Sequence, residues 1–256
     1  MDYNKYSRQS YNIGSKLINT TGFIVKNRLW VGFFQHRLVM ILSVIIALVI
    51  PYSIFNYLNS KVSSALSGIT TGSNIATSVA NNSTSIESIF EGGNKYLVLI
   101  LIQMLVVYFS NKTIEHLSGV TIHMSVKEMI MSQVRVINVS IRNWIYELII
   151  GIIISVAIGI FGPEWMTDVL KFLVGSYFVG FLFIDNYNFA FDLSIKESTA
   201  IVRKHAGAAL LVGMVAKILF IIPVLGALFV SFICSVATTW YMHTSNDAHD
   251  GKEAFV

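Results

Sequence analysis

The sequence predicts an all-α integral membrane protein with two spanning helices and two proline-broken helical hairpins. Charged residues make up only 12% of the 256 residues, and apolar residues make up 54%. Soluble domains contain about 25% charged residues, so this chain has too little charge to cover a water-facing surface. The apolar residues also cluster in long runs, and Pro163 and Pro223 each interrupt one of these runs in the C-terminal half of the chain.

The chain begins with a basic N-terminal segment, residues 1–37, which has six Lys or Arg residues and one acid, Asp2. Aromatic residues recur in it at roughly helical spacing: Phe23, Trp30, Phe33 and Phe34. This pattern is typical of an amphipathic helix that lies on an anionic membrane surface. A basic flank that only orients the first span would have the same composition.

Residues 38–243 are expected to form a single membrane domain, followed by a short polar tail at 244–256. Leu38 to Leu58 has no charge and is long enough to cross a hydrocarbon core of about 30 Å. Residues 59–95 are a polar excursion rich in Ser, Thr, Asn and Gly. The run from Tyr96 to Ser110 is the second predicted span, provided that its helix extends at both ends.

Residues 111–142 mix charged and apolar side chains and predict an amphipathic helix, although 133–142 alternates with the period of a strand. Two proline-broken pairs of apolar helices follow. Pro163 separates 148–161 from 169–184, and Pro223 interrupts the stretch 206–243, because proline lacks an amide hydrogen and clashes with the preceding turn.

The stretch 206–243 is either one kinked span or a hairpin with its tip at Pro223, and its length favours the hairpin. Paired broken helices indicate a transport pathway in many transporters, but prolines in ordinary loops between spans give the same pattern. The distribution of Lys and Arg predicts a cytoplasmic N-terminus and an outside location for 59–95. This orientation requires each proline-broken pair to return to the side from which it entered.

Several function classes are disfavoured. The single cysteine, Cys234, excludes an intramolecular disulfide and a cysteine-based metal site. The six histidines show no metal-ligand spacing, and neither a glycine-rich phosphate loop nor a GxSxG motif occurs. We therefore expect no enzyme activity, no cofactor and no metal. The positive charges are spread along the chain, which fits membrane topology better than nucleic-acid binding.

Polar residues within apolar segments are candidate functional residues. Lys217 lies six residues before Pro223, and a charge near the bilayer centre costs about 2.5–3.5 kcal/mol. Its ammonium is therefore expected to face a cavity or a partner, or to reach the membrane surface along its flexible stem. A stripe of small residues in the last helix is expected to pack against another helix: Ala227, Ser231, Ser235 and Thr239.

Two acidic residues, Glu147 and Asp185, bracket the first hairpin at similar depth. Either is expected to pair with Arg142 or Arg203, or to be a solvated flank of the apolar run. Arg37 is placed at the cytoplasmic mouth of the first span, where a guanidinium offers paired donors to an oxyanion.

The C-terminal part carries four short motifs: Asp185-Asn186-Tyr187, then Ser194-Ile195-Lys196-Glu197 with Arg203-Lys204-His205, then Ile222-Pro223, and finally Ala237-Thr238. Over residues 178–240 it resembles the CysZ-like sulfate permease family and its eukaryotic relatives, the etoposide-induced endoplasmic-reticulum proteins. The resemblance implies two spanning helices, two half-inserted hairpins, an oligomer and, in bacterial members, sulfate uptake. It also implies a bacterial cytoplasmic membrane as the location.

This chain departs from the family's pattern at the predicted anion-binding site. The family has a Gly-Leu-Arg motif before the first span, whereas this chain has Phe34-Gln35-His36-Arg37, so the arginine carries over and the glycine does not. The leading functional hypothesis is a transporter or channel for a small anion, with sulfate implied by the resemblance. The alternative is a non-catalytic scaffold or assembly subunit of a membrane complex. The expected anion-binding residues are Arg37, Lys217, His36 and Arg203, and the expected structural residues are Pro223, Pro163 and Asp185.

Overall fold

The computed structural model describes residues 3–29, 99–100, 102–121, 125–221 and 225–245. These residues are 88% helical and form no strand, so the prediction of an all-α protein is confirmed for them. The predicted span at 38–58, the polar excursion at 59–95 and Pro223 lie outside the described residues.

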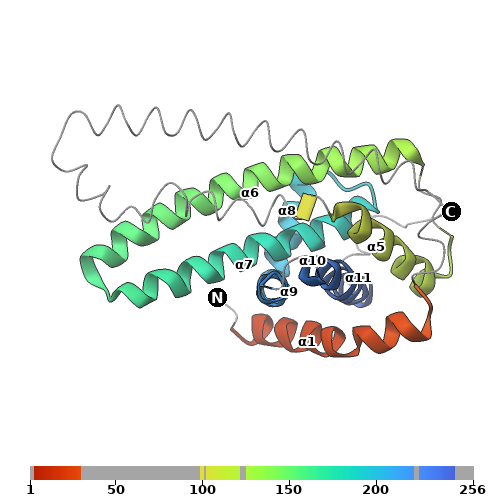
Figure 1. Cartoon of the computed structure of the whole chain (residues 1–256), viewed down its shortest axis with the longest axis horizontal. Coiled ribbons are helices and arrows are strands. Elements are labelled where there is room, and N and C mark those ends of the chain that lie inside the picture. Colours follow the sequence, from red (N-terminus) through yellow and green to blue (C-terminus); the bar gives the residue numbers. More distant parts are fainter. Residues whose placement is uncertain (1–2, 30–98, 101, 122–124, 222–224, 246–256) are drawn as a thin grey trace.

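Two long helices, α6 (Val126–Phe161) and α7 (Glu164–Phe189), form an antiparallel pair joined at Gly162 and Pro163 (Figure 1). Helix α6 begins with a capping box. The Ser125 hydroxyl accepts a hydrogen bond from the Glu128 backbone amide, and the Glu128 carboxylate accepts one from the Ser125 backbone amide. Both helices are long and apolar enough to cross a membrane.

The structure corrects the expected boundaries in this region. The sequence separated an amphipathic helix within 111–142 from a short apolar helix at 148–161, but α6 continues unbroken for 36 residues. The strand-like alternation at 133–142 therefore lies within a helix. Among the described helices, α6 and α7 are each both long and apolar enough to span, whereas α5 (Gln103–Ser118) has 16 residues and stands where part of the second span was predicted.

Helix α9 (Ala206–Leu219) crosses α7 with its backbone in direct contact. A Cβ on Gly180 of α7 would overlap the Ala209 carbonyl, and a Cβ on Gly213 of α9 would overlap the Ser176 carbonyl. Each helix thus presents two small residues four positions apart, an arrangement that lets membrane helices approach closely.

A short helix, α8 (Ile195–Lys204), precedes α9 and meets it at an angle of 92° around His205. The buried His205 ring places Nδ1 3.0 Å from the Tyr241 hydroxyl. Helix α1 (Tyr3–Lys26) covers this corner, where the Gln9 amide donates to the Lys204 carbonyl at 2.7 Å.

The C-terminal stretch consists of α10 (Leu225–Phe229), the π-helix η2 (Val230–Cys234) and α11 (Ser235–Thr244). In Figure 1, α9 and α11 lie between α7 and α1. The Ser235 hydroxyl donates to the Val106 carbonyl of α5 at 2.7 Å, and Thr239 shares a hydrogen bond with Ser110 at 2.8 Å. These contacts confirm that the predicted small-residue stripe packs against another helix.

Candidate functional site

The four predicted anion-binding residues do not form one site in the described part of the chain. Arg37 and His36 lie outside the described residues. Lys217 lies on α9 against α7, whereas Arg203 lies on α8 beside a hollow that opens toward α6. Lys217 and Arg203 therefore belong to different surroundings.

Lys217 lies in the last turn of α9, which ends at Leu219, and not in the middle of a long helix as the sequence suggested. Its Nζ donates to the Phe172 carbonyl at 3.2 Å and lies 4.4 Å from the centroid of the Phe172 ring. A cation in the last turn also interacts favourably with the helix dipole. Its described contacts therefore hold α9 against α7.

Arg203 lines a hollow of about 520 Å³ between α6 and α8. We call it the cationic hollow, and its lining residues are Arg142, Ile195, Lys196, Thr199, Ala200 and Arg203. Among the described residues, the lining contains three cations and one hydroxyl and no carboxylate. The α8 members recur at intervals of three and four residues, which places them on one face of the helix.

Arg142 is the half-buried member of this set. Its Nη2 donates to the Thr199 hydroxyl at 3.2 Å, and its guanidinium carbon lies 5.4 Å from the centroid of the Phe181 ring of α7. Its Nε is buried and has no hydrogen-bond partner among the described residues. Within those residues none of Arg142, Lys196 and Arg203 makes an ion pair. The described residues thus place three cations around the hollow without an ion pair among themselves.

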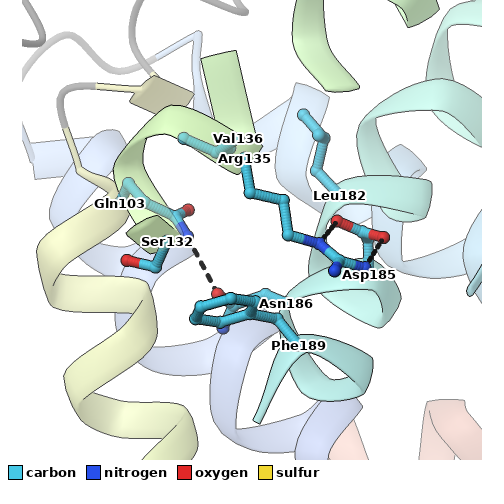
Figure 2. A pocket seen from close by; sticks show the side chains of 8 residues that line it. All are labelled: Gln103, Ser132, Arg135, Val136, Leu182, Asp185, Asn186 and Phe189. Carbon is cyan, nitrogen blue, oxygen red and sulfur yellow. Dashed lines mark hydrogen bonds and ion pairs between the residues drawn. The ribbon is translucent and has the colours of Figure 1, made fainter. Parts of the chain in front are cut away.

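A second polar cluster lies deeper between α6 and α7, as Figure 2 shows. The Arg135 guanidinium donates to both oxygens of Asp185, from Nε at 3.0 Å and from Nη2 at 2.8 Å. The two side chains are only 12% and 4% exposed. Beside them the Gln103 amide donates to Asn186 at 2.8 Å, and the cavity of about 10 Å³ has room for about one water.

This ion pair corrects the interpretation of Asp185. Its partner is Arg135 and not Arg142 or Arg203, and it is buried and not a solvated flank. The reason is the register of the α6–α7 pair, which turns at Gly162 and Pro163. That register sets Arg142 beside Phe181 and Arg135 beside Asp185.

Helix α8 connects the two clusters. The Ser198 hydroxyl donates to Asp185 at 2.5 Å, and Arg135 Nη1 donates to the Leu193 carbonyl at 2.5 Å, just before α8 begins. We call this set, Arg135, Asp185, Ser198 and the Leu193 carbonyl, the ion-pair network. The next residue, Thr199, accepts from Arg142. The ion-pair network therefore holds the helix that supplies two cations to the hollow.

The sequence did not predict that Arg142 and Lys196 line the same hollow as Arg203, or that Arg135 pairs with Asp185. Their signal was a spacing: Arg135 and Arg142 are seven residues apart, so in a helix they share a face. Because the same stretch also alternates with the period of a strand, its helical spacing was not recognised.

The described residues hold no group of three or more His, Cys, Asp or Glu side chains that could bind a metal ion. Comparisons with protein-family models, with curated proteins and with solved structures find no match to this chain. Its function must therefore be inferred from its own residues.

Proposed function

We propose that the protein is an integral membrane transporter for an oxyanion, with the cationic hollow as its binding site. The main support for the proposal is the grouping of Arg142, Lys196 and Arg203 around one hollow, with no carboxylate among the described residues that line it. Such a grouping suits a tetrahedral oxyanion, because guanidinium groups offer forked donors and an ammonium adds a point charge. Sulfate is the member of this class that the family resemblance implies.

The dimensions of α6 support a complete crossing of the bilayer by the α6–α7 pair. The 19 residue steps from Arg142 to Phe161, at about 1.5 Å each, cover about 28 Å, close to a hydrocarbon core of about 30 Å. Only 11% of the apolar window of α6 is buried within the chain, which suits a lipid-facing helix. At the far end Trp165 is 65% exposed, as expected of a side chain at the membrane interface.

This placement puts the cationic hollow at one aqueous end of the membrane helices. An anion there would be attracted more strongly than in bulk water, because the neighbouring hydrocarbon lowers the local dielectric constant. The exposed Lys196 and Arg203 side chains supply donors that an anion can reach.

The test is oxyanion binding and uptake by purified protein, with radiolabelled sulfate in liposomes as the first substrate. Arg142→Gln and Arg203→Gln should each weaken binding about tenfold or more, since a hydrogen bond to a charged group contributes about 1.5–3 kcal/mol. Lys127→Gln is the matched control, because Lys127 is an exposed cation of α6 outside the hollow. Binding and uptake that are unchanged in both arginine variants would contradict the proposal.

One observation favours the scaffold as a second candidate function. The outer face of α1 exposes Tyr11, Ile18 and Val25 at 78%, 82% and 59%. Their seven-residue spacing places them on one face of the helix, where an apolar partner could bind. Co-purification with a stoichiometric partner that is lost in Ile18→Lys, together with absence of flux, would favour the scaffold over the transporter.

A further inference from the structure

We propose that the oxyanion in the cationic hollow is the phosphate of an anionic phospholipid whose acyl chains lie along α6. This inference rests on the anion site of the proposed function and narrows its ligand. A free inorganic oxyanion needs only the cations, whereas a phospholipid also needs an apolar surface that starts at the hollow.

The face of α6 that carries Arg142 continues as such a surface. Intervals of four, three, four, three and four residues lead from Arg142 along one side of the helix. The residues at these positions, which we call the apolar stripe, are Tyr146 (50% exposed), Ile149 (47%), Ile153 (60%), Val156 (57%) and Ile160 (66%). All five are apolar or aromatic, and all are exposed in the folded chain.

The length of the stripe fits acyl chains. From Tyr146 to Ile160 there are 14 residue steps, which at about 1.5 Å each cover about 21 Å. The chains of one leaflet fill about half of a 30 Å hydrocarbon core, so the stripe is long enough to line them along their full length. Arg142 lies one helical turn before Tyr146, at the level where the phosphate of such a lipid would be.

The residues that line the hollow indicate which lipid headgroup fits there. A water needs about 10–15 Å³ of space measured in the same way, so a hollow of 520 Å³ has room for a group much larger than a bare tetrahedral ion, and Ile195 and Ala200 make part of its wall apolar. A glycerol phosphate with its ester groups matches this mixture of cations and apolar wall. Since no carboxylate among the described lining residues could pair with an amine, a headgroup without an amine, such as phosphatidylglycerol, fits better than a zwitterionic one.

The experiment measures binding to detergent-purified protein by native mass spectrometry and by the shift in thermal unfolding temperature. The probes are phosphatidylglycerol, phosphatidylcholine, glycerol 3-phosphate and sulfate. We expect phosphatidylglycerol to bind at least tenfold more tightly than the other three, and Arg142→Gln or Arg203→Gln to remove this preference, about 1.4 kcal/mol or more.

The acyl-chain arm uses Ile153→Trp and Val156→Trp, which stay apolar but change the shape of the stripe. They should weaken phosphatidylglycerol binding several-fold and leave glycerol 3-phosphate unaffected. Val169→Trp is the control, because Val169 is a similarly exposed apolar residue of α7 outside the stripe.

The outcomes separate the two proposals. If sulfate or glycerol 3-phosphate binds as tightly as the lipid, through the same arginines, the phospholipid inference is overturned and the oxyanion site stands. If neither arginine variant changes the binding of any probe, both the inference and the proposed site are overturned.

Discussion

Substitutions of the buried ion pair between Arg135 and Asp185 test how much this pair contributes to the stability of the fold. Asp185→Leu removes the carboxylate and leaves the Arg135 guanidinium, which is only 12% exposed, with the Leu193 carbonyl as its one remaining described hydrogen-bond acceptor. Removing one partner of a buried pair costs about 3–5 kcal/mol, because the other charge stays buried and uncompensated. Arg135→Met should cost a similar amount for the same reason.

The double variant Arg135→Met/Asp185→Leu has no unpaired charge. What remains is the cost of the Leu193 carbonyl without its donor and of the Ser198 hydroxyl without its acceptor, about 1–3 kcal/mol for a group that stays buried and unsatisfied, and Ser198 still accepts from the Asn188 amide at 2.9 Å. We therefore expect the double variant to be no less stable than either single variant, although the two single costs add to about 6–10 kcal/mol.

Thermal unfolding of the purified protein, followed by circular dichroism, measures these differences. For a chain of this size 1 kcal/mol corresponds to roughly 2–4 °C, so each single variant should unfold at least about 6 °C below the parent. Lys112→Gln is the control, since Lys112 is 37% exposed and its pair with Glu115 contributes at most about 1 kcal/mol. Single costs that add in the double variant to within about 0.5 kcal/mol would refute the reasoning.

Three further predictions follow from the helix packing. Gly213→Ala should destabilise the protein by about 1–3 kcal/mol, because its Cβ would overlap a carbonyl of α7, while Gly151→Ala, which meets no atom within 4 Å, should be neutral or stabilising in the same unfolding assay. Lys217→Met should leave oxyanion binding unchanged, since Lys217 lies outside the cationic hollow. Cysteines at Glu164 and Ser245 should label from opposite sides of the membrane, and labelling of both from one side would exclude a complete crossing by α6 and α7.

Much of the helical layout could be predicted from the sequence, because the length and composition of an apolar run report whether a helix can leave water. Gly162 and Pro163 separate α6 from α7, and the Ser235 side chain of α11 packs against α5 as expected. The length of α6 could not be predicted in the same way. By hydropathy alone, the charges of 126–142 mark the end of an apolar helix. The helix nevertheless continues through these charged residues, because nothing there breaks its backbone hydrogen bonds.

The candidate site was less predictable than the fold. Lys217 was selected because it is the one charge in the apolar stretch 206–243, but hydropathy does not reveal that it lies in the last turn of a helix. Arg203 was predicted as an anion-binding residue, yet its neighbour across the hollow, Arg142, comes from a segment 61 residues earlier. Periodicity shows which residues share a helix face, but it does not show which helix lies opposite that face.

The ion-pair network also bears on why these charges lie inside the fold. A buried ion pair is often no more stabilising than apolar residues of similar volume, so stability alone is a weak reason for its presence. Its geometry supplies another reason: Arg135 binds the Leu193 carbonyl before α8 and Asp185 binds Ser198 within α8, so together they set the position of that helix. The double variant should therefore lose less stability than the sum of the two single costs. Its oxyanion affinity should still fall below that of the parent, because α8 would no longer hold Lys196 and Arg203 opposite Arg142. Affinity equal to that of the parent would show that α8 is positioned without the network.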